Sequence, residues 1–160
     1  MKRLRIYLDT SVIGGCFDHE FSLWSNALVE DFLAESFVPV LSQLTALEIG
    51  PAPERVQAKY AELRNLGAEF IEIAGEALQL AQAYEQHGVL PSSLRNDMLH
   101  IALATVAEVD VLVSWNFKHI VRLDKIRIFN AVNLELGYKS LQIYSPREVT
   151  LHGRERDQNS

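Results

Sequence analysis

The sequence contains a single cysteine and lacks any apolar run of the roughly 18 residues that a membrane-spanning helix needs. One cysteine excludes an internal disulfide and a thiolate metal or redox motif, so we expect Cys16 to be a buried or half-buried structural residue. The first apolar segment is short and is interrupted by Asp9, which is not the pattern of a signal peptide. We therefore expect a protein of the cytoplasm that makes no membrane contact.

An excess of positive charge is also missing. The chain has 15 Lys and Arg against 21 Asp and Glu, a net charge of −6, which disfavours nucleic-acid binding if charge is averaged over the whole surface. A bound cation would reverse the local sign where the acids gather. Bases collect within one short segment, at Lys118, His119, Arg122, Lys125 and Arg127. This segment is either a local basic strip or the solvated face of a helix.

Linkers, repeats and low-complexity segments are absent from the sequence as well. The 160 residues are enough for one domain with a hydrophobic core, and 48% of them are hydrophobic. We expect one domain over residues 1–152, followed by a polar, flexible tail over residues 153–160.

Short apolar runs alternate with amphipathic segments along the chain. Strands are predicted at residues 4–8, 37–41, 70–73, 109–113 and 141–144, and helices at residues 21–35, 42–49, 53–66, 74–87 and 91–106 and in a region that ends near Gly137. Residues 10–15 are predicted as a loop. The alternation predicts parallel strands joined by right-handed crossovers, and hence a three-layer α/β/α sandwich with a mostly parallel central sheet. Ligands bind such folds beyond the carboxyl ends of the strands.

Three carboxylates stand inside or beside apolar runs, namely Asp9, Glu48 and Asp97. An ionised carboxylate against a hydrophobic core must be paired, hydrogen-bonded or bound to a cation, and the sequence shows no evident basic partner for any of the three. We therefore expect a divalent cation held by several of them. Asp97 shares a helical stripe with His100, one turn further along.

Four segments resemble the motifs of a PIN domain, in particular those of the VapC-like toxins of bacterial type II toxin–antitoxin pairs. They are residues 7–11 around Asp9, 45–49 around Glu48, 96–104 around Asp97, and 111–116. Their order and spacing cover nearly the whole chain. The departure is Asn116, which stands where the family usually carries a fourth carboxylate.

The resemblance implies an endoribonuclease that hydrolyses RNA phosphodiester bonds with Mg²⁺ or Mn²⁺. Asp9 and Asp97 would ligate the metal directly, whereas Glu48 would bind a second ion, orient the attacking water or act as general base. The oxygen of Asn116 could face a cation through a water, or the side chain could position a phosphate oxygen. Thr10 and Ser11 are predicted as supporting residues that bind the phosphate or hold Asp9. An RNA substrate, a cognate antitoxin and a homodimer are the implied partners.

Other interpretations stay open. Loss of the fourth carboxylate at Asn116 is also compatible with a catalytically impaired module that binds RNA or protein, and a phosphatase of another α/β fold is a weaker alternative. His100 and His119 lack the spacing of a zinc motif, so we expect them to be structural. The stripe formed by Phe21, Trp24 and Leu28 either receives a helix of a partner or packs on the sheet.

Overall fold

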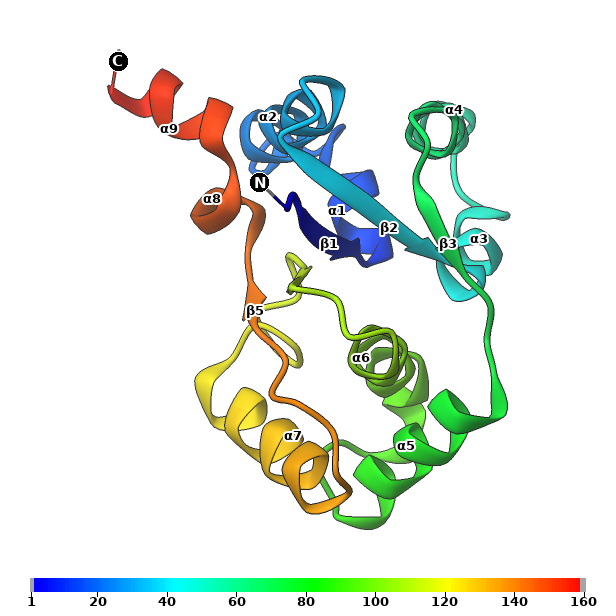
Figure 1. Cartoon of the computed structure of the whole chain (residues 1–160). Helices are drawn as coiled ribbons and strands as arrows, with labels where there is room; N and C mark the ends of the chain where they lie inside the picture. The colour runs from blue at the N-terminus through cyan, green and yellow to red at the C-terminus, as the bar shows by residue number, and fades with distance from the viewer. Residues whose placement is uncertain (1, 159–160) are drawn as a thin grey trace.

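A five-stranded parallel sheet forms the centre of the computed structural model, which describes residues 2–158 (Figure 1). The strands are β1 (Leu4–Leu8), β2 (Phe37–Ser42), β3 (Glu69–Ile71), β4 (Val111–Val113) and β5 (Ile143–Tyr144). Their order in the sheet is β3-β2-β1-β4-β5, and each neighbouring pair runs parallel. The predicted α/β class is confirmed, with a sheet that is entirely parallel.

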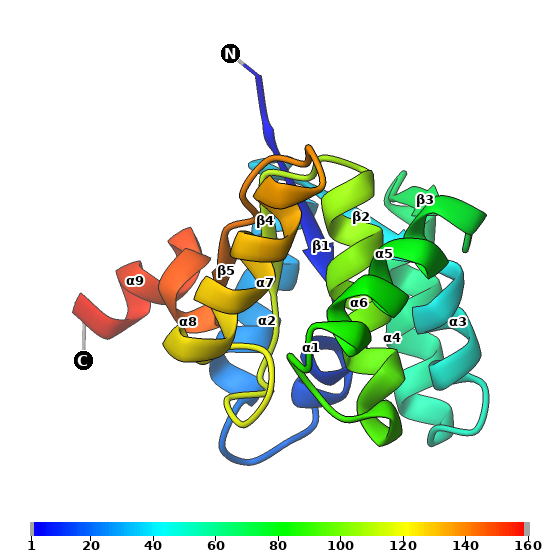
Figure 2. The same cartoon turned by 90° about the horizontal axis from the view of Figure 1, so that it is seen from below.

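Helices cover both faces of this sheet and follow the strands in alternation. They are α1 (Thr10–Gly15), α2 (Ser22–Leu33), α3 (Gln43–Ile49), α4 (Glu54–Asn65), α5 (Gly75–Gln86), α6 (Arg95–Val106), α7 (Leu123–Glu135), α8 (Pro146–Val149) and α9 (Leu151–Gln158), with a 3-10 turn η1 at Ser92–Leu94. Figure 2 looks onto the layer of α5, α6 and α7, while α1, α2 and α4 lie on the opposite face. Within residues 2–158, none of the helices has the length and apolar character to cross a bilayer.

The alternation of side chains along β1 divides the core in two. Ile6 and Leu8 pack in one hydrophobic cluster with residues of α1 and α2. Tyr7 points the other way, into the cluster built by α5, α6 and α7. Because both faces are covered, every side chain from Ile6 to Leu8 is buried. This alternation places the Tyr7 hydroxyl on the side of helix α6.

The segment after β1 differs from the prediction. Residues 10–15 form helix α1 rather than a loop, with Asp9 at the N-cap in extended conformation. The paired glycines at 14 and 15 suggested a loop, but Gly15 has a packing role. A Cβ atom there would lie 2.7 Å from both Ser25 Oγ and Trp115 Nε1, so only glycine lets α1 approach α2 this closely.

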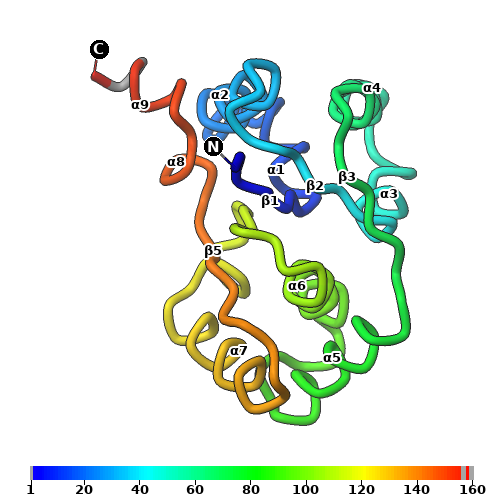
Figure 3. Tube along the Cα trace, in the orientation of Figure 1, coloured from blue at the N-terminus to red at the C-terminus, as the bar shows by residue number. Residues whose placement is uncertain are grey.

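The C-terminal segment also differs from the prediction. A polar, flexible tail was expected from residue 153, whereas the chain forms helix α9 up to Gln158, beside α2 (Figure 3). Residues 159–160 of that predicted tail, and residue 1 of the predicted domain, lie outside the described residues. The domain boundary at residue 152 stays a prediction.

A buried carboxylate on α2 attaches α9 to the domain. Asp31 is fully buried and accepts hydrogen bonds from Thr150 Oγ1 at 2.6 Å and from the backbone N–H groups of Leu151 and His152, both at 3.0 Å. The His152 ring contributes a further bond through Nδ1. Asp31 therefore acts as an N-terminal cap for α9 from a helix more than a hundred residues earlier.

The stripe predicted on α2 is covered by the chain itself. A Cβ atom on Gly153 would lie 2.8 Å from Trp24 Cε3, so α9 passes close over the indole. The Arg147 guanidinium lies 5.1 Å from the centroid of the Trp24 ring. Leu28 is fully buried, and Phe21 stacks on Trp115. The stripe thus packs within the domain, but Trp24 does so against α9 and Arg147, whereas the second interpretation had the stripe packing on the sheet.

The contact between Asp31 and His152 predicts a pH-dependent stability. The hydrogen bond with Asp31 raises the pKa of His152. The pKa of His152 is therefore higher in the folded than in the unfolded chain. The stability that the contact adds is complete below the ordinary histidine pKa of about 6.5, and it is lost as the pH rises through the raised pKa of the folded chain. Denaturant unfolding should show His152→Gln less stable than the wild type near pH 6, with a gap that narrows toward about pH 9. A gap that does not change with pH would contradict this, and the exposed His87→Gln serves as control.

Candidate active site at the carboxyl edge of the sheet

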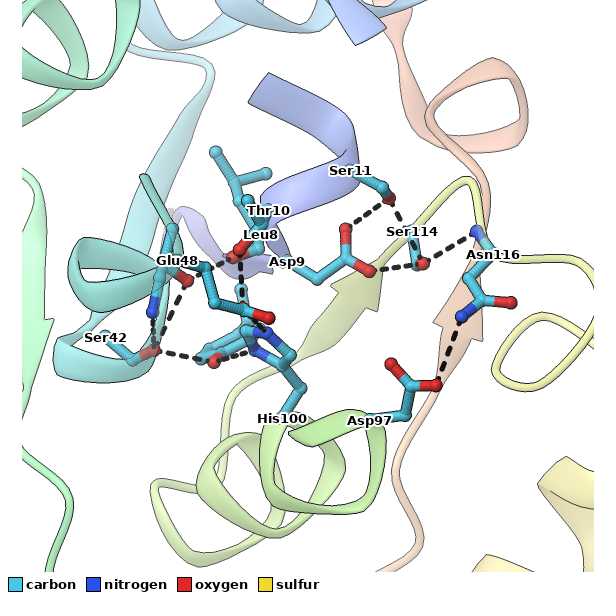
Figure 4. A network of polar contacts seen from close by, with 12 residues as sticks. Leu8, Asp9, Thr10, Ser11, Ser42, Glu48, Asp97, His100, Ser114 and Asn116 are labelled. Carbon is cyan, nitrogen blue, oxygen red and sulfur yellow. Dashed lines mark hydrogen bonds and ion pairs between the residues drawn. The ribbon is translucent and has the colours of Figure 1, made fainter. Parts of the chain in front are cut away.

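Parallel strands bring the predicted site residues to one edge of the sheet (Figure 4). Asp9 follows β1, Asn116 follows β4, and Glu48 lies on α3 directly after β2. Asp97 lies in the first turn of α6, which packs beneath this edge. The structure therefore brings together all four residues that the sequence proposed, from segments up to about a hundred residues apart.

Asp9 is held by two serine hydroxyls. Its side chain is buried, and Ser11 Oγ donates to Oδ1 at 2.6 Å while Ser114 Oγ donates to Oδ2 at 2.5 Å. Burial raises the pKa of Asp9, against the opposing effects of His100 and the two hydroxyls. Each carboxylate oxygen keeps a further lone pair, so Asp9 can still ligate a cation.

The same two serines fix the loop after β4. Ser11 Oγ accepts from the backbone N–H of Trp115 at 2.9 Å, and Ser114 Oγ accepts from the backbone N–H of Asn116 at 2.9 Å. The end of β4 is thereby attached to Asp9 through hydroxyl bridges. The predicted role of Ser11 in holding Asp9 matches this geometry, whereas Ser114 was not proposed as a site residue.

Glu48 has a partner that the sequence did not reveal. Its Oε1 accepts hydrogen bonds from His100 Nε2 at 2.5 Å and from Thr10 Oγ1 at 2.7 Å. Burial alone would raise the pKa of Glu48, but the hydrogen bond and charge of His100, together with Thr10, bring it below its usual value. The premise that the sequence offers no basic partner for any of the three acids is therefore wrong for Glu48. Thr10 holds Glu48 rather than Asp9.

A buried hydrogen-bonded chain stands behind His100. The Nδ1 atom of His100 lies 2.6 Å from the Tyr7 hydroxyl, which in turn lies 2.8 Å from Ser42 Oγ. Burial raises the pKa of Tyr7 far above its usual value, so the phenol keeps its proton at neutral pH. His100 is thus the satisfied, buried histidine that was predicted, but it also fixes the direction of Glu48.

Asp97 carries the least compensated charge of the three. Among the described residues, its hydrogen-bond partner is Asn116, whose Nδ2 lies 3.5 Å from Oδ2, at the outer limit for such a bond. Burial raises the pKa of Asp97, and the charge of Glu48 adds to this rise while His100 and His119 oppose it. A half-buried carboxylate with so little support is a natural ligand for a cation.

Asn116 presents its amide nitrogen, and not its oxygen, to the site. The Oδ1 atom accepts from the backbone N–H of His119 at 2.9 Å, as in a local turn, while Nδ2 points to Asp97. The oxygen thus accepts a hydrogen bond, which is one of the roles expected for it, and ligation of a cation through a water stays a prediction. A donor in this position can bind a phosphate oxygen instead, which is the other role that the sequence suggested.

The donor set suits one hard cation. Among the described residues, no cluster of three or more His, Cys, Asp or Glu side chains is arranged to hold a metal. Asp9 and Asp97 supply two carboxylates whose pKa values are raised by burial, and Mg²⁺ commonly uses one or two carboxylates while it keeps several waters. Glu48 Oε1 already has two hydrogen-bond donors, His100 and Thr10. The residues therefore fit a site for one ion rather than a cage of three carboxylates.

Of the basic side chains predicted at residues 118–127, only some are free of polar contacts with other described groups of the protein. Arg122 pairs with Asp124, and Lys125 Nζ donates to the carbonyl of Val89 at 2.9 Å. Lys118 and Arg127 are exposed. The described side chains of this segment thus spread over a loop and a helix, as expected for a solvated face.

Comparisons with known proteins identify the fold. No family model matches this chain, and no curated protein matches it closely enough to count as a relative. The crystal structure of VapBC2 from Rickettsia felis, bound to a DNA fragment from its promoter, aligns with a TM-score of 0.55 and 17% identity over 88% of this chain and 97% of that chain. FitAcB from Neisseria gonorrhoeae aligns with a TM-score of 0.57 and 14% identity over 90% of this chain and 99% of that chain. At such identities the likeness shows that the fold is shared.

The partly buried link between Glu48 and His100 can be measured with a double-mutant cycle. Unfolding of wild type, His100→Leu, Glu48→Leu and the double variant at pH 7 should give a coupling of about 1–3 kcal/mol, because each single variant leaves a polar partner without its bond. The pair formed by His87 and Glu135 is the matched control, since its side chains are 43% and 67% exposed. Its coupling should stay below about 0.5 kcal/mol. If the coupling free energy of the Glu48–His100 pair were no larger than that of the His87–Glu135 pair, the link between Glu48 and His100 would add nothing to stability beyond an exposed pair.

Proposed function

We propose that this chain is a metal-dependent endoribonuclease that hydrolyses RNA phosphodiester bonds and acts as the toxin of a type II toxin–antitoxin pair. The observation that carries the proposal is the placement of Asp9 and Asp97 at the ligand-binding edge of a parallel sheet, both with pKa values raised by burial. Ser114 and Asn116 link the two carboxylates.

The shared fold supports this proposal. VapBC2 and FitAcB are toxin–antitoxin complexes, and the motifs of this sequence resemble the VapC-like toxins. The RNA substrate, the antitoxin and a homodimer remain parts of the proposal, as does a place in the cytoplasm.

In the proposed site Asp9 and Asp97 hold Mg²⁺ or Mn²⁺. The ion would lower the pKa of a bound water and neutralise charge on the phosphate. The two serines keep Asp9 in one orientation, so binding requires little rearrangement. Asn116 Nδ2 is placed to donate to a phosphate oxygen beside Asp97.

Glu48 orients the attacking water. Its lowered pKa keeps it ionised at neutral pH, and bonds from His100 and Thr10 occupy one of its oxygens, Oε1. The other oxygen can accept a hydrogen bond from water. Because a carboxylate with a lowered pKa is a weak base, its contribution is orientation more than proton abstraction.

A binding module that has lost catalysis is the second candidate. Asn116 favours it, since the amide nitrogen approaches Asp97 where a further carboxylate would strengthen a metal site. The two candidates differ in what Asp97 does. In the nuclease it is essential for cleavage, whereas a module would keep its RNA affinity and its cellular effect in an Asp97→Asn variant.

Cleavage of a mixed pool of structured RNAs is the direct test. Purified protein should cleave RNA with Mg²⁺ or Mn²⁺ but not with EDTA, and Asp97→Asn should lower the rate by more than about 100-fold, because a ligand to the metal is lost. Asp124→Asn, at an exposed acid on α7, is the matched control and should cleave normally. If no metal supports cleavage and mass spectrometry shows no bound antitoxin, the binding module becomes the better description.

Metal binding can be detected without any activity. Because burial raises the pKa of Asp97, its ionised form weakens the fold at neutral pH, so Asp97→Asn should unfold at a higher temperature than the wild type in EDTA. Added Mg²⁺ should stabilise the wild type, by about 2.7 kcal/mol at a hundredfold excess over Kd, and the variant much less. A variant that gains as much from Mg²⁺ as the wild type would exclude Asp97 as a ligand, and Asp124→Asn again serves as control.

A further inference from the structure

A half-exposed aromatic residue directly follows the site residue Asn116 in the chain. This residue is Phe117, and 49% of its surface is exposed. Its ring lies 6.0 Å from that of Trp115, tilted by 60°, and 6.5 Å from that of Phe21, tilted by 49°. In contrast, Phe21 and Trp115 stack at 4.2 Å with only 16° between their planes. Both neighbours thus support Phe117 at an angle and do not stack flat on it.

In the part of the chain that the structure describes, the two other exposed phenylalanines, Phe17 and Phe70, each have an arginine over the ring, unlike Phe117. Phe70 is 38% exposed and has the Arg64 guanidinium 4.1 Å above its ring centroid, and Phe17 is 37% exposed with Arg55 at 5.5 Å. Among the described residues, no such cation lies over Phe117. A single exposed apolar side chain is common on protein surfaces, so exposure alone carries no argument. The available ring surface matters here because Phe117 is the residue directly after Asn116 in the chain.

The residues that follow supply the charge that a polyanion needs. Lys118 is exposed, directly after the aromatic ring. His119 is near enough to Asp97 to oppose the rise of its pKa, and its backbone N–H donates to Asn116. Residues 116–119 therefore combine an amide donor beside the carboxylates, an aromatic ring and a cation. Stacking rings beside basic groups are how proteins hold single-stranded nucleic acid.

We propose that Phe117 stacks on an unpaired nucleobase next to the phosphodiester at Asp9 and Asp97, with Lys118 contacting a flanking phosphate. Phe117 thereby positions the nucleotide and determines specificity for unpaired segments. This inference rests on the proposed function, because it takes its ligand to be RNA. A protein partner on the same ring is the competing occupant, and it is separated by the test.

The test measures stacking directly, apart from cleavage. The probe is a short single-stranded RNA that carries 2-aminopurine, whose fluorescence is quenched when the base stacks, and it is titrated with Asp97→Asn protein in Mg²⁺ to prevent cleavage. Adding Phe117→Leu should weaken binding by about 10-fold and abolish the protein-dependent quenching, whereas Phe117→Trp should retain both. Phe70→Leu is the matched control, because this ring is similarly exposed but lies on β3, and it should leave both readings unchanged.

The outcomes separate this inference from the proposed function. If the protein cleaves RNA but Phe117→Leu changes neither affinity nor quenching, the inference is wrong and the nuclease stands. If no cleavage is found but Phe117→Leu loses binding and quenching, the stacking role holds in a binding module. Equal loss in Phe70→Leu, or a duplex probe bound as tightly as the single strand, would overturn the inference. The inference would also be overturned if the Phe117→Leu variant bound RNA normally but no longer bound a co-expressed partner protein.

Discussion

The buried carboxylate of Asp9 is the constraint on which the site depends. It follows the central strand β1, where burial makes an ionised side chain costly unless it is hydrogen-bonded. Ser11 from α1 and Ser114 from the end of β4 meet this need, and their oxygens accept backbone N–H groups of the next loop. Satisfying one acid thus fixes the start of α1, the end of β4 and the direction of Asn116. The hydrogen bonds that make Asp9 tolerable also assemble the edge where the other acids meet.

The three acids at this edge differ in the groups that stabilise their charge. Asp9 is held by hydroxyls, Glu48 is hydrogen-bonded by His100 and Thr10, and Asp97 is left with one long contact to Asn116. The difference follows from which element each faces. Glu48 on α3 lies opposite the face of α6 that carries His100, and Tyr7 supports this imidazole from the sheet. Burial raises the pKa values of Asp9 and Asp97, so these two are the acids to which the proposed function assigns the cation.

The sequence predicted the fold and the positions of the acids because both depend on local patterns. Alternating apolar runs specify strands and helices, and parallel strands place their carboxyl ends together. The partners of these acids were not predictable in the same way. His100 and Glu48 are 52 positions apart, and His152 and Asp31 are 121 apart, so periodicity shows which face each occupies but not what lies opposite. Helix α1 was missed because Gly15 signals a turn in sequence, whereas its role is a close approach to Trp115.

The electrostatic division of the site bears on how many cations the proposed nuclease uses. A second ion would need a second pair of anionic ligands, and the candidates are Glu48 and the side chain at position 116. Glu48 Oε1 already accepts hydrogen bonds from His100 and Thr10, so a cation there would compete with these donors. Asn116 offers Asp97 a hydrogen-bond donor in place of a carboxylate. With both candidates engaged in this way, the proposed nuclease would use one cation, held by Asp9 and Asp97. The donor of Asn116 then supplies part of the phosphate binding that a second ion would otherwise provide.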